Sequence, residues 1–364
     1  MRWRWLGVAL MVLLLPVWLS GCWDIYSVGD RAPMLVLYVA PAKGSDYTWT
    51  FFMPNPSVTT GSLVNLSTQE QYYERTVRAP SLSEALDDAQ FETTRHVSEG
   101  SLEDIVLAST LTAPQVVQVI HSYNRLGSWP ETAYVVVVNP GRQPFPISTH
   151  QPVPDVYYTR YFECRHCQPL DLSRREWKIW DDYVTPGVST VIPYANDRRN
   201  PSQLAVYTRS KVVFLSPSQT VGWAILTNHV SSLAIGVKTP MGRVVVRGVR
   251  TRTRVTVRKA GGSLHAAVRV SIVGNLVQWP MGRRMTPKDV REIDAAVSHH
   301  VLDVCRSTIN AGDRFGIDPV GFGRKYFFGH PGEALYADRH YSKVWPVDTV
   351  IHVSSRVVMT GVNS

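Results

Sequence analysis

The chain has 364 residues, of which 44% are hydrophobic and 18% are charged, and its formal net charge is +9. This composition is typical of a globular protein and excludes a disordered chain, and the length allows two or three domains. Four cysteines are too few for a fold that depends on a framework of disulfides.

The N-terminal segment has the pattern of a secretory signal peptide. Two arginines within the first four residues precede an apolar run, Leu6–Leu19, which is shorter than the roughly twenty residues of a membrane-spanning helix. The run ends in the sequence LSGC, which matches the bacterial lipobox. We therefore expect cleavage between Gly21 and Cys22. We also expect a diacylglyceryl thioether and an N-acyl group on Cys22, which would anchor the chain outside the cytoplasmic membrane.

Strand and helix patterns alternate in the N-terminal part that follows. The segments Met34–Val39 and Thr48–Met53 are strand-like. A helix is predicted from about Ser81, because Ser81 and Glu84 have the spacing of a capping box and the next apolar residues share one face.

A βαβ unit is predicted next. Ile105–Leu107 is a short apolar strand, and Pro114–Leu126 is a helix with proline in its first turn and Gly127 after its end. The segment TAYVVVVNP is then rich in β-branched residues and apolar on both faces. A strand of this kind after a helix indicates a locally parallel sheet.

Several prolines between residues 140 and 154 indicate a domain boundary. The segment from Tyr157 to about Thr220 is expected to be irregular, with an aromatic-rich patch at residues 177–183. Within it, LAVYTRSKVVFL is predicted to form a hairpin.

The C-terminal part has a different pattern. From Gly242 onward, arginines alternate with Thr and Val, Gly261-Gly262 offers a turn, and Ala267–Val273 returns. This alternation predicts an antiparallel sheet with one face exposed to water. A long helix capped by Thr286 is expected to end at Asn310-Ala311-Gly312, and a last strand is expected from Val350 to Met359.

These patterns predict a mixed α/β, multi-domain fold. It would combine an N-terminal domain with a βαβ unit, a smaller middle domain, and a C-terminal antiparallel sheet packed with a long helix. The expected divisions are a signal peptide at residues 1–21 and domains at residues 22–148, 149–222 and 223–364.

Cys164 and Cys167 have the spacing of redox and zinc sites. A zinc site needs a second pair of ligands, and a thioredoxin-like site needs the cysteines at a helix N-terminus after a buried strand. Cys305 stands alone, and Pro169 follows the pair. A local disulfide between Cys164 and Cys167, or two ordinary thiols, is therefore favoured over either site.

The arginines of residues 243–258 form a basic stripe. Nucleic-acid surfaces usually interleave stacking aromatic residues with basic ones, and this stripe has none, so no nucleic-acid partner is expected. A solvated sheet face is the first interpretation, and contact with anionic lipid or an acidic partner is the second. His299 and His300 lack the i, i+4 spacing of a metal pair. No catalytic residues, metal or cofactor are predicted.

Several segments resemble the C-subunit lipoproteins of spore germination receptors, the Ger(x)C or GerAC-like family. They are LSGCWD, SLSEALDDAQFETTRHVSEGSLEDIVLAS, TAYVVVVNPG, LAVYTRSKVVFLSPSQTVGWAIL, GIDPVGFGRKYF and WPVDTVIHVSSRVVMTG. The family has an Asp and a Gly-x-Gly turn after its long helix, which here are Asp318, Gly321 and Gly323. Trp345 matches the tryptophan of a later segment. The resemblance implies structural roles for these four residues.

The resemblance also implies a function and a location. It predicts three α/β domains in a lipoprotein on the outer face of the spore inner membrane, as one subunit of a nutrient germinant receptor. The implied partners are an A subunit with membrane and soluble parts and a transporter-like B subunit. The rival hypothesis is a lipid-anchored solute-binding protein of a transporter, which would need two comparable lobes around a cleft. A thiol enzyme using Cys164 and Cys167 ranks third.

Overall fold

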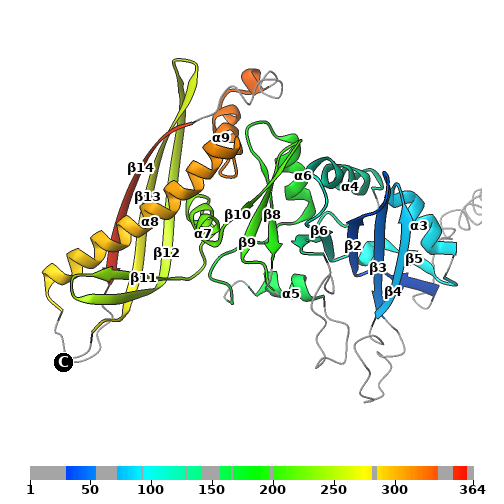
Figure 1. Cartoon of the computed structure of the whole chain (residues 1–364), viewed down its shortest axis with the longest axis horizontal. Coiled ribbons are helices and arrows are strands. Elements are labelled where there is room, and N and C mark those ends of the chain that lie inside the picture. Colours follow the sequence, from blue (N-terminus) through cyan, green and yellow to red (C-terminus); the bar gives the residue numbers. More distant parts are fainter. Residues whose placement is uncertain are drawn as a thin grey trace, which may run out of the picture.

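The structure is a computed structural model. It describes residues 30–54, 72–91, 93–127, 129–140, 156–164, 167–196, 200–280, 285–334 and 347–358. Figure 1 shows that the elements are spread along one long axis, with the N-terminal strands at one end and the C-terminal sheet and its long helix at the other.

The first part of the chain is built on an eight-stranded sheet. Its strands are β2 (Val36–Pro41), β3 (Tyr47–Pro54), β4 (Tyr72–Ala79), β6 (Asp104–Ala108), β7 (Tyr134–Val138), β8 (Thr190–Ala195), β9 (Gln203–Tyr207) and β10 (Val212–Leu215). They lie in the order β10-β9-β8-β7-β6-β2-β3-β4. Two short strands, β1 (Arg31–Pro33) and β5 (His96–Ser98), pair with each other, and the 3-10 turn η3 (Glu99–Ser101) follows β5.

The predicted βαβ unit is confirmed. The helix α4 (Ala113–Arg125) connects β6 to β7, and these two strands pair in parallel. The central strands β2, β6, β7 and β8 are all parallel to their neighbours within this group. Because such strands are covered on both faces, they read as continuous apolar runs in the sequence.

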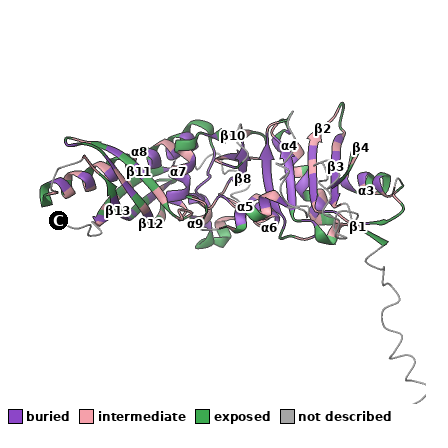
Figure 2. Ribbon diagram, turned by 90° about the horizontal axis from the view of Figure 1, so that it is seen from below, coloured by how far each residue is buried: buried purple, intermediate pink, exposed green. Residues whose placement is uncertain are grey.

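Helices cover both faces of this sheet. One face packs against α3 (Leu82–Phe91), α4 and α6 (Glu176–Val184), and the other packs against α5 (Tyr157–Glu163). Ser81 caps the start of α3, since its hydroxyl accepts a hydrogen bond from the Glu84 N–H at 3.3 Å and donates one to the Glu84 carboxylate at 2.8 Å. Figure 2 shows the strands of this sheet largely buried between the helices.

The segment from Tyr157 to Thr220 is regular, so the expectation of an irregular segment was wrong. It contains α5, α6, β8, β9, β10 and the start of α7 (Pro217–Leu226). The helices are short and Pro193 lies within β8, and both features weaken a periodic signal. The hairpin predicted here is confirmed, because β9 and β10 pair antiparallel.

The large sheet joins residues on both sides of an expected domain boundary. The boundary at 148/149 falls between β7 and β8, which pair through Val137 and Tyr194. The boundary at 222/223 falls within α7.

The C-terminal part is a four-stranded sheet covered on one face by helices. Its strands lie in the order β11 (Leu233–Thr239), β12 (Gly242–Ala260), β13 (Ser263–Gln278) and β14 (Asp348–Val358). Helix α7, the long helix α8 (Pro287–Phe315) and the short helix α9 (Phe322–Phe328) contribute to the hydrophobic cluster on its inner face. The expected fold class, mixed α/β with a long helix on a C-terminal sheet, is confirmed.

Two details of this part differ from the prediction. First, α8 continues through Gly312 and ends at Phe315, where Gly316 adopts the left-handed conformation (φ 59°) of a helix C-cap. Second, β14 pairs parallel to β13, because a helical crossover returns the chain in the same direction. The capping of α8 by Thr286 and Asp289 is confirmed.

Helices α7 and α8 approach each other closely at Gly222. A Cβ atom there would lie 2.2 Å from the Thr308 hydroxyl oxygen and 2.3 Å from the Val304 carbonyl oxygen. The Thr308 hydroxyl instead donates to the backbone carbonyl of Gln219 at 2.8 Å. The close approach and this hydrogen bond hold α7 against α8, directly after β10, the edge strand of the large sheet.

Candidate functional site

The residues singled out after the long helix lie at a junction between the two parts of the molecule. We define the Asp318 loop as residues 318–324 and the α6–β8 loop as residues 185–189. The backbone N–H of Ser189 donates to the Asp318 carbonyl at 2.8 Å, and the Ser189 hydroxyl accepts from the Asp318 N–H at 2.8 Å. The two loops are therefore joined by reciprocal hydrogen bonds.

The Asp318 carboxylate organises its own loop. Its Oδ1 accepts the Gly321 N–H at 2.7 Å, and its Oδ2 accepts the Gly323 N–H at 2.9 Å. The side chain is fully buried, so these two bonds replace its contacts with water. Gly321 has φ 75° and starts α9, a conformation that favours glycine. The Asp-x-x-Gly-x-Gly pattern is thus a helix-start motif.

Gly187 allows the two loops to meet. Its φ is +79°, and a Cβ atom there would lie 2.4 Å from the carbonyl carbon of Gly323 and 2.6 Å from the backbone nitrogen of Arg324. The Gly187 carbonyl accepts the Arg324 N–H at 2.6 Å. No side chain fits between these two backbones.

Charged side chains hold the same junction from α6. The Arg324 guanidinium donates to Asp182 at 2.7 Å and to Asp181 at 2.8 Å. The Lys178 ammonium lies 2.7 Å from the Asp181 carboxylate and 3.1 Å from the Asp182 carboxylate. Partial burial raises the pKa of Asp181, but the hydrogen bonds from Lys178 and Arg324 outweigh it and hold that pKa below its usual range. Asp182 is buried, so the cluster is partly shielded from water and salt.

A cluster of three packed side chains, Arg174, Trp223 and His229, lies beside the junction. Trp223 of α7 donates its indole N–H to the Pro319 carbonyl at 2.8 Å, and the Arg174 guanidinium carbon lies 4.9 Å from the centre of the Trp223 ring. His229 stacks on the same ring at 4.8 Å. Burial, followed by the charge of Arg174, lowers the pKa of His229 to about 4, so this imidazole is neutral at pH 7.

The hydrogen bonds fix the tautomer of His229. Arginine can only donate, so the His229 Nε2, 3.4 Å from Arg174 Nη1, is an acceptor and the proton lies on Nδ1. The Nδ1–H then donates to the Thr227 hydroxyl oxygen at 2.9 Å. Because both ring nitrogens are hydrogen-bonded within the protein and the ring stacks on Trp223, we assign His229 a structural role.

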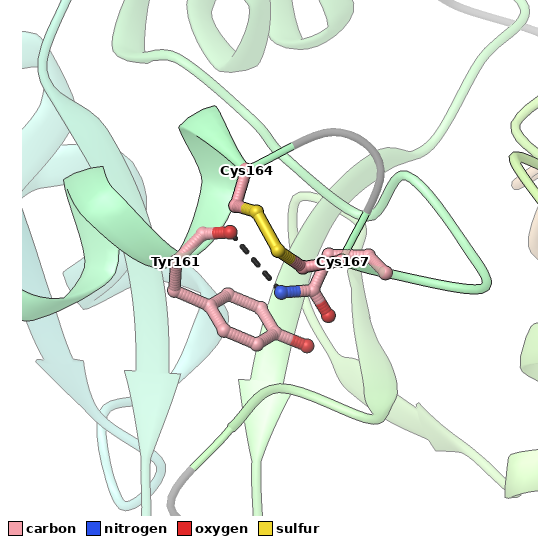
Figure 3. Close-up of a disulfide and its surroundings, with 4 residues drawn as sticks. Tyr161, Cys164 and Cys167 are labelled. Carbon is pink, nitrogen blue, oxygen red and sulfur yellow. Dashed lines mark hydrogen bonds between the residues drawn. A yellow bond between two sulfur atoms is a disulfide. The ribbon is translucent and has the colours of Figure 1, made fainter.

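The cysteine pair lies at the end of α5, away from the junction. Cys164 and Cys167 form a disulfide with Cα atoms 5.3 Å apart, shown in Figure 3. The side-chain amide of Gln168 donates to the Tyr161 carbonyl at 3.1 Å, the dashed line in Figure 3. Cys305 is buried and unpaired, and burial raises the pKa of its thiol to about 12.

Replacing both Cys164 and Cys167 with serine should leave the fold around α5 intact. The disulfide closes a very short loop, so its loss should lower the free energy of unfolding by about 2 kcal/mol. Thermal unfolding and the circular dichroism spectrum of the variant measure these two effects. Loss of the folded structure in the variant would show that the fold depends on this disulfide.

The other predicted sites are placed as follows. Gly21, Cys22 and Trp345 lie outside the described residues. His299 and His300 are exposed, and His299 pairs with Asp303 at 2.9 Å. Within the part of the chain that the structure describes, no group of three or more His, Cys, Asp and Glu side chains could hold a metal ion.

Sequence reasoning found Asp318, Gly321 and Gly323 through the family resemblance, and the structure brings them together. It missed Gly187, Ser189 and Arg324. The adjacent Asp181-Asp182 pair and the Thr185-Pro186-Gly187 turn were visible signals, but neither reveals a partner more than a hundred residues away.

Two family models match the chain. Residues 25–196 match the spore germination protein N-terminal domain, and residues 202–361 match the spore germination B3/GerAC-like C-terminal domain. A search of curated proteins finds no match. Among solved structures, the crystal structure of the GerBC protein is similar, with a TM-score of 0.53 and 13% sequence identity over 88% of this chain and 96% of that one.

The two family models divide the chain within the large sheet. The first ends just after β8, and the second begins just before β9, its neighbour in the large sheet. The Asp318 loop of the second contacts the α6–β8 loop of the first. The similarity to GerBC extends over both parts. The chain therefore belongs to the GerAC-like family of spore germination proteins.

Proposed function

We propose that the protein is the non-catalytic C subunit of a nutrient germinant receptor, tethered to the spore inner membrane by a lipid on Cys22. The observation that carries the proposal is the pair of family matches, which together extend over residues 25–196 and 202–361. The family and the fold support a germinant receptor C subunit. The membrane-embedded A and B subunits are its proposed partners, and it would act in receptor assembly and in the response to germinants.

The role of the buried polar groups supports a structural function. Asp318 binds backbone N–H groups at the junction. Asp104 accepts the Tyr158 N–H at 3.0 Å and the Thr159 hydroxyl at 2.8 Å, which holds the start of α5. Burial raises the pKa of Asp104 to about 7. Each of these ionisable groups is engaged in positioning a helix, a role that requires no substrate.

The lipid tether is supported by the LSGC sequence at residues 19–22. No helix in the described ranges is long and apolar enough to cross a membrane. The rival hypothesis of a solute-binding protein has less support, because the eight-stranded and four-stranded sheets are unlike each other and do not form two comparable lobes.

Replacing Cys22 with alanine should release the protein from the membrane fraction of spores. Alanine has no thiol to form the thioether, so the two acyl chains needed for stable anchoring would be lost. Fractionation followed by immunoblotting measures the distribution, and the thermal unfolding of the released protein checks that the fold is intact. Full retention in the membrane fraction of variant molecules that lack the leader, as shown by their mass, would contradict the tether.

A further inference from the structure

The outer face of the C-terminal sheet is strongly basic. Between Asp197 and Asp289 the sequence contains sixteen Lys and Arg residues and no Asp or Glu. On the central strand β12 the exposed side chains of this face include Arg243, Arg247, Arg250, Arg252, Arg254 and Arg258. Helices α7, α8 and α9 pack on the opposite, inner face.

The strand is shaped to keep its arginines on one side. The pairing of β12 with β13 shifts between Arg247 and Arg250, at Gly248, whose φ is +63°. This extra residue lets Val249 remain in the core, while Arg247 and Arg250 both stay exposed. Without the bulge, the alternation after Arg247 would place the next arginines in the core.

Two arginines also face each other across the strands. Arg254 of β12 lies directly opposite Arg269 of β13. Like charges in direct cross-strand positions are destabilising. Among the described residues, no carboxylate forms an ion pair with Arg254 or Arg269. The Asp348 carboxylate at the edge of this face pairs with His265, at 3.0 Å. The face therefore carries a repulsion that an external anion would relieve.

The form of the face favours an extended anionic surface over a compact ligand. Its charges follow the length of β12 and continue onto β13 and β14, where Val273 and Val350, 48% and 53% exposed, lie among them. The described strands of this face carry no Phe, Tyr or Trp side chain on which a nucleic-acid base could stack. Arginines interspersed with apolar side chains suit the boundary between lipid headgroups and acyl chains.

We infer that the outer face of the β11–β14 sheet binds the anionic phosphate headgroups of the membrane to which the protein is attached. The choice of a membrane as the partner rests on the proposed function. The face would act as a second contact besides the lipid on Cys22. Together they would hold the elongated body along the bilayer, where it meets the embedded subunits.

The test uses the mature chain from position 22 onward with Cys22→Ala, prepared without the apolar leader, so that binding depends on neither the leader nor the tether. Its sedimentation is measured with vesicles of phosphatidylcholine alone and with vesicles that also contain phosphatidylglycerol. We expect binding to the anionic vesicles only, and a decrease as the salt concentration rises. Equal binding to both kinds of vesicle, or binding to neither, would overturn the inference without bearing on the tether, which the fractionation of spores tests separately.

Charge-reversal variants localise the contact. Arg252→Glu with Arg254→Glu should lower the partition coefficient on anionic vesicles by more than about twentyfold, since each basic residue near such a surface contributes about fivefold and the surface repels the two introduced carboxylates. The carboxylate introduced at position 254 would face Arg269, so the variant should remain folded. The matched control, Arg291→Glu with Arg306→Glu, makes the same change of charge on exposed positions of α8 and should alter binding less than about threefold. Equal effects of the two pairs would overturn the assignment to this face.

A competitor and two direct binding tests distinguish other anionic partners. Inorganic phosphate, compared with sodium chloride at equal ionic strength, should release no additional protein from the vesicles. Specific release by phosphate would show that the face binds a free anion, which would overturn the inference of membrane binding. Binding to an acidic peptide or to DNA in the absence of binding to anionic vesicles would likewise overturn the lipid assignment.

Discussion

Replacing Gly187 with alanine is expected to lower the free energy of unfolding by about 4 kcal/mol, from the strain of a left-handed backbone together with overpacking. The added Cβ atom would lie 2.4 Å from the carbonyl carbon of Gly323, which is backbone and has no alternative rotamer. The α6–β8 loop would have to move away from the Asp318 loop. We therefore expect a fall in the thermal midpoint of about 5 °C, together with faster proteolysis near the junction.

Gly44→Ala is the matched control for this change. Gly44 has φ +78°, almost the same as Gly187, but a Cβ atom there would meet nothing within 4 Å. This variant should show the backbone strain alone, about 1 kcal/mol. If both alanine variants unfold at the same temperature, the close contact at Gly187 does not stabilise the junction.

Asp318→Ala should have an effect of similar size, about 4 kcal/mol, because it leaves two buried N–H groups without an acceptor and each costs about 2 kcal/mol. These are the amides of Gly321 and Gly323. The start of α9 should loosen and Arg324 should lose its position against α6. Calorimetry measures the stability, and hydrogen exchange at the Gly321 and Gly323 amides measures the local change.

Asp318→Asn removes the charge of the carboxylate but keeps the shape of the side chain, so it separates the two contributions. The amide keeps one acceptor oxygen and presents its NH2 group to the other backbone N–H, so we expect about half of the loss. Wild-type protection of both glycine amides in either variant would contradict the role assigned to Asp318.

Local signals predicted much of the fold. The capping residues at Ser81 and Thr286 start helices where the sequence placed them, since such caps act within three residues. The alternation of arginine with Thr and Val in residues 250–258 correctly gave the two faces of β12. Both patterns depend on neighbouring residues alone, which is why one sequence was sufficient.

Predictions that needed distant contacts were less successful. The helix was expected to stop at Gly312, but Gly312 is buried within α8, and the helix continues to the Gly316 cap. Tertiary packing there overrides the low helix propensity of glycine. The pairing of β14 parallel to β13 depends on the path of the chain over the sheet, which no local pattern records.

The junction shows the same limit. The family resemblance identified the Asp318 loop, but its partners on α6 and in the α6–β8 loop are separated from it by more than a hundred residues. A glycine that fits against another backbone looks like any turn glycine in the sequence. The role of Gly187 is therefore visible only in the folded structure.

Co-purification from spore membranes tests the central claim most directly. The protein, carrying an affinity tag and its native Cys22, would be isolated in mild detergent, and the proteins bound to it identified by mass spectrometry. A receptor C subunit should bring down a multi-spanning A subunit and a transporter-like B subunit, and Cys22→Ala should reduce their recovery. Recovery of the protein alone, or with the permease of a solute transporter, would contradict the assignment.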